Sequence, residues 1–126
     1  MNLNELSSEI LNAAITVHKE LGPGLLESVY QSCMILELST RKLNFQSELP
    51  VPVFYRGIRV NNEGFRIDLL VEDSIVVELK SVEKVQQVHK KQVLTYLRLT
   101  RKPLGLLINF NENILVDGVS RIANNL

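Results

Sequence analysis

Cysteine, tryptophan and histidine are scarce in this chain of 126 residues, and their scarcity excludes several kinds of site. The one cysteine, Cys33, has no partner for an internal disulfide, and two histidines make no Cys/His cluster for structural zinc. Aromatic residues are 6% of the chain and are scattered along it, so the sequence shows no base-stacking platform for single strands. We expect Cys33 to be a small hydrophobic residue on an apolar helix face.

Long hydrophobic runs and a basic leader are also missing. The strongest apolar stretch, residues 104–110, is far shorter than the ~18 residues that suggest a membrane span. The first nine residues contain acidic residues, whereas the start of a signal peptide contains basic ones. Hydrophobic residues make up 45% and charged residues 22%, as in ordinary globular proteins. We therefore expect a soluble, cytoplasmic protein with a single domain over residues 1–126.

The net charge is zero, but the charges are unevenly distributed. Residues 1–40 hold five glutamates and one lysine, whereas residues 80–102 hold seven bases and one acid. A basic stretch of this kind either binds phosphates or is a charged helix face that keeps the domain soluble.

Two helices are expected in the first third of the chain. Apolar residues recur at helical spacing from Leu6 to Leu21, with Asn4 as the N-cap, and residues 22–24 (Gly-Pro-Gly) must end this helix. A second helix is expected to end near Lys42. Its predicted inner side consists of Leu26, Val29, Tyr30, Cys33 and either Leu36 or Met34.

The remaining pattern alternates strands with one helix. Residues 45–55 indicate a strand that two prolines place at an edge or make irregular, and turn signals at 56–57 and 61–64 bracket a short strand. Residues 65–71 and 75–80 are strands joined by the turn 72–74, followed by a helix over 85–99 and a strand over 104–110 that is buried on both faces. A short strand over 114–116 and a frayed or helical tail complete a mixed α/β fold with antiparallel pairs.

Residues 65–80 are the most informative segment. With Asp73 at the centre of the turn, Asp68 lies directly opposite Glu78, with Cβ atoms about 4.5–5.5 Å apart. A slip of one residue would set Asp68 against Leu79 on the apolar face, which burial of that face forbids. Lys80 shares the face of Glu78. The sequence thus predicts two adjacent carboxylates with a lysine beside them.

Two carboxylates this close repel each other unless something compensates. Mg²⁺ or Mn²⁺ suits oxygen ligands, and Lys80 would then orient or deprotonate a water, or stabilise the reacting phosphorus, in metal-assisted hydrolysis of a phosphodiester. In the alternative interpretation, the three residues are solvated groups on an exposed sheet face with an ordinary ion pair. This segment alone does not decide between the two.

Neighbouring positions favour a phosphate site. Gln92 and Tyr96 lie four apart on one helix face, where an amide and a phenol could position phosphate or water. Glu27 lies in the first turn of the second helix, where it either stabilises the helix start or is a third carboxylate at the metal. Arg66 either contacts phosphate or pairs with the acids. Of the histidines, His18 is expected to be a surface or packing residue.

Together these segments resemble the GxxExxY protein family of the PD-(D/E)xK nuclease superfamily. Residues 24–30, Gly-Leu-Leu-Glu-Ser-Val-Tyr, fit the GxxExxY signature. Asp68 with Glu78-Leu79-Lys80 fits the nuclease core, and Gln92 with Tyr96 fits the Q-x-x-x-Y element. The similarity runs through nearly the whole chain in the right order. Ile67 stands where the pattern has proline, a position that shapes the turn and not the chemistry.

The resemblance implies a restriction-endonuclease-like core, with a central mixed β-sheet flanked by helices, and a Mg²⁺-dependent (or Mn²⁺-dependent) nuclease acting on nucleic acid, with DNA as the expected substrate. The implied site comprises Glu27, Asp68 and Glu78 as metal ligands, Lys80 assisting the attacking water, and Gln92 and Tyr96 in support. Expected substrate contacts are Arg66, Lys84, His89, Lys90 and Lys91.

Two other hypotheses stay open. One is a catalytically silent module that binds nucleic acid through the basic side chains between residues 84 and 98. The other is an oligomerising domain whose acidic and basic faces are complementary between subunits. Because the core fold occupies most of the chain, we expect a homodimer or a partner protein to supply sequence specificity.

Overall fold

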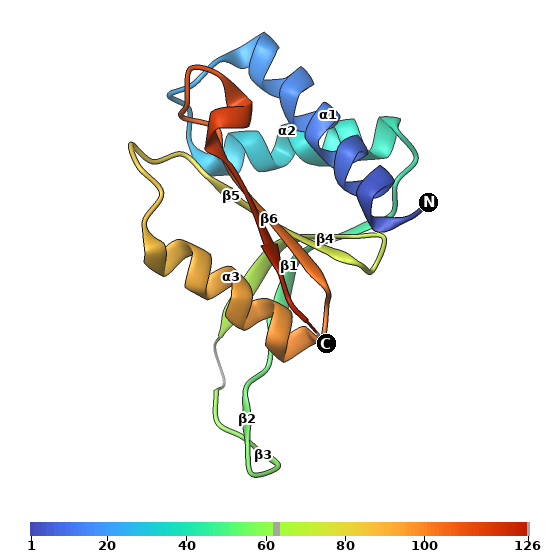
Figure 1. The fold of residues 1–126 in the computed structure, drawn as a ribbon, viewed down its shortest axis with the longest axis vertical. Helices are drawn as coiled ribbons and strands as arrows, with labels where there is room; N and C mark the ends of the chain where they lie inside the picture. Colours follow the sequence, from blue (N-terminus) through green and yellow to red (C-terminus); the bar gives the residue numbers. More distant parts are fainter. Residues whose placement is uncertain (62–63, 126) are drawn as a thin grey trace.

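A five-stranded mixed sheet with helices on both faces forms the body of the protein in the computed structural model, which describes residues 1–61 and 64–125 (Figure 1). The strand order is β1-β4-β5-β6-β7, with β5 and β6 parallel and the other neighbours antiparallel. The elements are α1 (Leu3–Leu21), α2 (Glu27–Thr40), β1 (Phe45–Val51), β2 (Phe54–Tyr55), β3 (Ile58–Arg59), β4 (Phe65–Val71), β5 (Ile75–Lys80), α3 (Gln87–Thr100), β6 (Leu104–Asn109), the 3₁₀ helix η1 (Leu115–Gly118) and β7 (Val119–Ala123). The expected mixed α/β fold with antiparallel pairs is confirmed.

Hydrophobic residues cover both faces of the sheet. Helices α1 and α2 pack on the face of Leu69, Val77 and Leu106, and α3 packs on the face of Leu70 and Val76. Strand β6 is buried over its whole length, as its apolar sequence predicts. Strand β1 lies at the edge of the sheet, as its prolines predict. Because both faces are covered, polar residues of the central strands are accessible only where the layers end.

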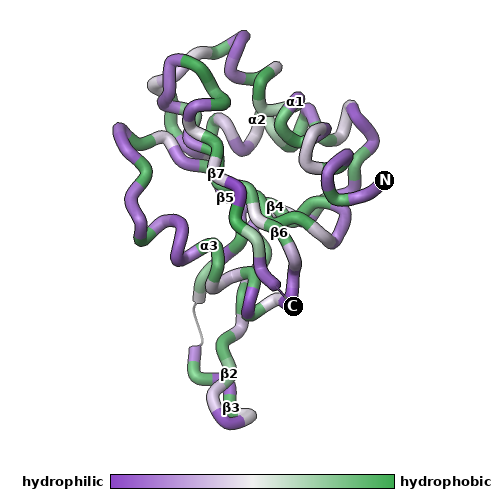
Figure 2. The backbone as a smooth tube through the Cα atoms, viewed as in Figure 1, coloured by the Kyte–Doolittle hydropathy of each residue, from purple (hydrophilic) through white to green (hydrophobic). Residues whose placement is uncertain are grey.

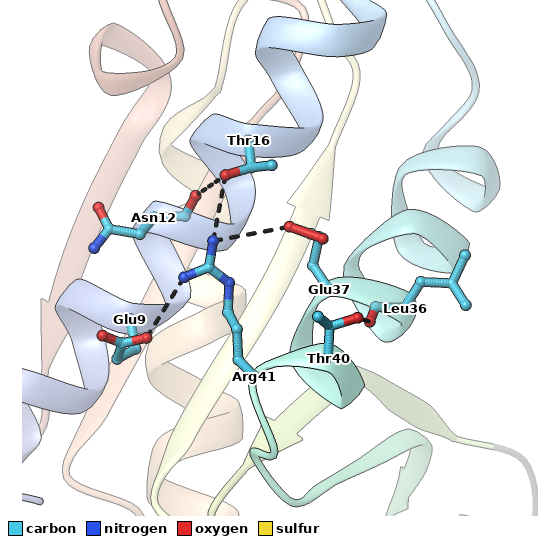
Figure 3. Close-up of polar contacts among 7 residues, drawn as sticks. All are labelled: Glu9, Asn12, Thr16, Leu36, Glu37, Thr40 and Arg41. Carbon is cyan, nitrogen blue, oxygen red and sulfur yellow. Dashed lines mark hydrogen bonds and ion pairs between the residues drawn. The ribbon is translucent and has the colours of Figure 1, made fainter.

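The two helices of the first layer are joined by Arg41, which directly follows α2 (Figure 3). Its guanidinium contacts Glu9 of α1 at 3.5 Å and Glu37 of α2 at 3.8 Å, and donates to Thr16 Oγ1 at 3.3 Å. Two glutamates of the acidic N-terminal third are therefore engaged inside this layer.

Helix α2 buries only part of the predicted side, because Tyr30 and, of the two alternatives, Met34 lie inside as expected and the other members do not. Tyr30, Met34 and Leu38 are fully buried, whereas Leu26 and Leu36 are 74% and 69% exposed. Val29 is also exposed, and Cys33 is only half-buried, although it does pack against the core as expected. Hydrophobic residues occur all round α2, so the spacing alone did not show which stripe meets the sheet. The stripe that packs against the sheet consists of Tyr30, Met34 and Leu38, which are spaced four residues apart.

Both ends of the chain also differ from expectation. Asn2, not Asn4, caps α1, its Oδ1 accepting from Glu5 N at 2.8 Å. Residues 115–118 form a 3₁₀ helix, whereas a strand over 114–116 was predicted, and the tail is strand β7, whereas a frayed or helical tail was predicted. Strand β7 forms because antiparallel pairing with the buried strand β6 satisfies its backbone hydrogen bonds.

The segment predicted as one strand over residues 45–55 is divided. Strand β1 ends at Val51, and Phe54 and Tyr55 pair instead with Ile58 and Arg59 in a separate ribbon, β2–β3, that projects from the body (Figure 1). The turn at Arg56-Gly57 is confirmed. Of the predicted turn at 61–64, residues 62 and 63 lie outside the described part of the chain.

Candidate functional site

Strands β4 and β5 pair in the register that the sequence predicts. Leu69 faces Val77, Leu70 faces Val76, and Val71 faces Ile75. At the next position the backbone ladder ends, and the two carboxylates take the place of backbone acceptors. Asp68 N donates to Glu78 Oε1 at 2.9 Å, and Leu79 N donates to Asp68 Oδ2 at 2.8 Å. Each acid is therefore held by the opposite strand, and both lie between the strands.

Burial makes this carboxylate pair costly when both groups are charged. Glu78 is 6% exposed, and burial, followed by the charge of Asp68, raises its pKa to about 8. The pKa of Asp68 is raised as well, chiefly by burial. The charge of Lys80 lowers the pKa of each acid without cancelling these effects. Lys80 is half-buried, and its ammonium forms no ion pair with any residue in the described ranges.

The free oxygens of the pair suit a hard divalent cation. Within residues 1–61 and 64–125, no donor bonds to Oδ1 of Asp68 or Oε2 of Glu78. Mg²⁺ and Mn²⁺ prefer oxygen ligands, and carboxylates supply both the oxygens and the negative charge. In the same ranges, no three His, Cys, Asp or Glu side chains are grouped closely enough to hold a metal ion. The pair therefore suits a cation whose remaining ligands would be water and substrate oxygens.

Glu27 is brought to the end of β5, near the pair but not into it. It is the first residue of α2, it is exposed, and its Oε2 accepts from Ser81 N at 3.3 Å. Ser81 Oγ also donates to Leu25 O at 2.6 Å, so the start of α2 is fastened to the residue after Lys80. The charge of Glu27 contributes to the raised pKa of Asp68, although burial and other groups contribute more.

Tyr30 holds the loop that precedes Glu27. Its hydroxyl donates to Gly22 O at 2.6 Å and accepts from Leu25 N at 3.2 Å, and its ring stacks on Phe110 with centroids 4.4 Å apart. Gly22 and Gly24 have positive φ angles of 70° and 97°, which favour glycine. The tyrosine and glycine of the GxxExxY pattern thus shape the loop that sets the position of Glu27.

Removing the Tyr30 hydroxyl should weaken the fold measurably. The substitution Tyr30→Phe removes two partly buried hydrogen bonds, to Gly22 O and from Leu25 N, each worth about 0.5–1.5 kcal/mol. We therefore expect the free energy of unfolding to fall by about 1–3 kcal/mol in a urea titration. The matched control Tyr55→Phe changes a side chain that is 63% exposed and should shift the value by less than about 0.5 kcal/mol. Equal effects of the two substitutions would contradict the loop-holding role.

Glu48 and Gln31 lie at the site although the sequence did not indicate them. Glu48 interrupts the pairing of β1 with β4 at the position facing Asp68, and it has a positive φ of 52°. Its Oε1 accepts from Gln31 Nε2 at 3.0 Å, and the same amide approaches Asp68 O at 3.4 Å. The charge of Glu48 raises the pKa of both Asp68 and Glu78. Only the spacing of Gln31, one turn after Glu27, was a usable signal.

Gln92 and Tyr96 share a face of α3, as predicted, and line an open groove of about 420 Å³. Burial, followed by the charges of Glu78 and then Asp68, raises the pKa of Tyr96 to about 12. The phenol therefore lies close to the carboxylate pair and stays protonated at neutral pH. The other residues lining the groove are Phe65, Val88, His89, Lys91 and Thr95.

The predicted substrate-binding residues are only partly brought together. Lys91 and His89 line the groove, but His89 Nδ1 also accepts from Gln86 N at 3.0 Å and so caps α3. Arg66 donates to Glu48 O at 3.3 Å and is exposed. Lys84 is exposed and Lys90 half-buried, and no contact ties either side chain to the acids within the described part. Figure 2 shows hydrophilic residues over the first half of α3.

His18 is a packing residue, one of the two roles expected for it. It is 7% exposed, and its Nε2 lies 2.7 Å from Glu112 O, in the α1 layer.

The comparisons with known proteins agree with this arrangement. The family model of the PD-(D/E)XK nuclease superfamily matches residues 4–122. No curated protein and no solved structure matches the chain. No helix in the described residues has the length and apolar character needed to cross a membrane.

Proposed function

Because this chain belongs to the PD-(D/E)XK nuclease superfamily and has its restriction-endonuclease-like mixed sheet, we propose that it hydrolyses phosphodiester bonds of DNA with a divalent metal ion. The observation that carries the proposal is the carboxylate pair Asp68 and Glu78, which interrupts the β4–β5 ladder and leaves one oxygen of each acid for a cation. Lys80 lies beside the pair. Burying two like charges between strands costs stability, and a catalytic cation explains why the fold retains them.

Each residue of the site has a proposed task. Asp68 and Glu78 would hold Mg²⁺ or Mn²⁺, which when bound lowers the pKa of coordinated water and neutralises charge on the phosphate. Glu27, which lies near the pair and accepts from Ser81 N, would have to turn toward the pair to become a third ligand. Lys80 would orient the attacking water and stabilise negative charge that develops on the phosphoryl oxygens. Gln92 and Tyr96 would donate hydrogen bonds to phosphate oxygens. The proposed substrate contacts are Arg66, Lys84, His89, Lys90 and Lys91.

Metal binding is the first test. The wild-type protein should be stabilised against heat by millimolar Mg²⁺ or Mn²⁺, since a ligand that binds only the folded state at a hundred times its Kd adds about 2.7 kcal/mol. Asp68→Asn should lose this gain. Asp117→Asn, which removes an equal charge from an exposed side chain in η1, should keep this gain. The readout is the unfolding midpoint across a metal titration.

Two results would contradict the proposal. One is a wild-type midpoint that responds to neither metal, together with no cleavage of single-stranded or double-stranded substrates. The other is an equal response in wild type and Asp68→Asn, which would place the metal elsewhere.

A second candidate is a catalytically silent nucleic-acid-binding module on the same fold. This candidate is favoured by the segment 80–102, in which basic residues outnumber acidic ones seven to one. It predicts salt-dependent binding that survives Glu78→Gln unchanged and is accompanied by no cleavage in any metal. Cleavage by the wild type that Glu78→Gln abolishes would exclude it.

A further inference from the structure

The β2–β3 hairpin is a defined structure that projects from the end of β1 and β4 (Figure 1). Arg56 and Gly57 at its turn both have positive φ angles, 50° and 77°, as a tight two-residue turn requires. At its base, Val60 N donates to Val53 O at 3.0 Å, and Val53 N donates to Asn61 Oδ1 at 2.7 Å. The hairpin is thus held in place at its base, yet strands of two residues have no core of their own.

The hairpin exposes every large hydrophobic side chain of its two strands. Single exposed hydrophobic residues are common, but a group of them on one projecting element indicates a binding surface. Figure 2 shows hydrophobic and hydrophilic residues side by side along this ribbon. The exposed fractions are 59% for Phe54, 63% for Tyr55, 67% for Ile58 and 59% for Val60.

Each face of the hairpin combines an aromatic ring with an arginine. Phe54 pairs with Arg59 across the strands, so the two share a face. On the other face, the guanidinium of Arg56 lies over the ring of Tyr55, 5.4 Å from its centroid. Residues 52–61 contain these two bases and no acid. Rings that stack on bases, beside cations that contact phosphates, are the usual elements of single-strand binding.

A further exposed aromatic residue, Phe65, lies at the start of β4, beside the groove of the candidate site. Phe65 is 46% exposed and packs on Tyr96 with centroids 5.8 Å apart. Both residues line the groove along α3 that also holds Gln92. Asp68 follows Phe65 by three residues on the same strand. Phe65 and Tyr96 therefore form an aromatic pair at the groove, in addition to the rings exposed on the hairpin.

On the basis of the proposed nuclease function, we propose that the β2–β3 hairpin is a nucleic-acid-binding arm that stacks unpaired bases on Phe54 and Tyr55 and contacts phosphates through Arg56 and Arg59. Unpaired bases are the expected partner because aromatic rings need open base faces, which a duplex hides within its own stack. The preferred substrate is then single-stranded DNA or the single-stranded part of a branched molecule.

Binding of labelled oligonucleotides to the full chain tests this arm. Fluorescence anisotropy in EDTA, which prevents cleavage, compares a 5′-labelled single strand of about 20 nucleotides with a duplex of the same sequence. F54S/Y55S should weaken single-strand binding about tenfold or more with an unchanged salt dependence. R56Q/R59Q should reduce the slope of log affinity against log salt by about 1.4, since each single-strand phosphate contact contributes about 0.7. K19Q/K42Q, which removes two lysines from the α1–α2 layer, should leave the single-strand affinity within about twofold.

Three outcomes would contradict the proposal that the β2–β3 hairpin is a nucleic-acid-binding arm for unpaired bases. Hairpin variants that bind as the K19Q/K42Q control does, while the wild type binds or cleaves, would refute the arm and leave the proposed nuclease intact. An equal loss for single strand and duplex would refute the preference for unpaired bases. A wild-type dimer in light scattering that F54S/Y55S dissociates, without loss of affinity for nucleic acid, would show that the hairpin contacts a second copy. A wild type that neither binds nor cleaves any substrate would refute the proposed function itself.

Discussion

Replacing Asp68 with Asn is expected to lower the rate of phosphodiester cleavage by at least about a thousandfold, and Lys80→Gln by about a hundred- to ten-thousandfold. The two losses have different causes. Asp68→Asn removes a proposed ligand of the cation, so metal-induced stabilisation is lost with activity. Lys80→Gln removes the charge that acts on water and the phosphoryl oxygens, so the metal response should survive. Cleavage of a labelled oligonucleotide and the unfolding midpoint with metal are measured on the same samples.

A lysine outside the site provides the control for these rates. Lys102 forms an exposed ion pair of 2.9 Å with Asp73 at the other end of the β4–β5 hairpin, and Lys102→Gln should keep at least half of the wild-type rate. If Lys80→Gln lost the metal response as well as activity, Lys80 would support the fold of the site without acting on the substrate.

The metal-free protein is expected to lose stability as the pH rises from 5 to 8. Burial raises the pKa of Glu78 from 4.5 to about 8, so the folded state binds this proton more tightly than the unfolded state does. The resulting stabilisation is complete below the ordinary pKa of the carboxyl and is lost as the pH passes through about 8. We expect a decrease of a few kcal/mol, since each unit of pKa is worth about 1.4 kcal/mol. Urea titrations in EDTA at several pH values measure it.

The substitution Glu78→Gln should remove most of this pH dependence, because an amide of nearly the same shape has no proton to lose. Asp117→Asn serves again as the control and should leave the wild-type profile unchanged. Millimolar Mg²⁺ should restore stability at pH 8 in the wild type and not in Glu78→Gln. A wild-type stability that rises between pH 5 and 8 would show that the pair is already compensated within the chain.

Local patterns were sufficient to predict the central hairpin. Two strands of hydrophobic residues joined by a polar turn centred on Asp73 predict one register, and this register is the one observed, although both faces of the two strands are covered. The same reasoning placed Asp68 across from Glu78. It did not show that the ladder stops at this point and that each carboxylate accepts a backbone N–H, because this depends on how far the strands stay paired.

Contacts between distant segments account for what the sequence did not show. Glu48 meets Asp68 only because β1 pairs with β4, and Glu27 meets Ser81 only because α2 lies over the end of β5. The tail becomes strand β7 because β6 has a free edge beside it. Phe65 and Tyr96, far apart in the chain, line one groove because α3 packs on this face of the sheet.

The sequence by itself determined the α/β class, the register of the acidic hairpin and the identity of its two carboxylates and lysine, since periodicity and turn chemistry act over a few residues. Only the tertiary structure decided which stripe of α2 is buried, which further acids face the pair and where the exposed aromatics gather. Those features depend on pairings between segments tens of residues apart, and only packing of the whole chain selects among the alternatives that local preference allows.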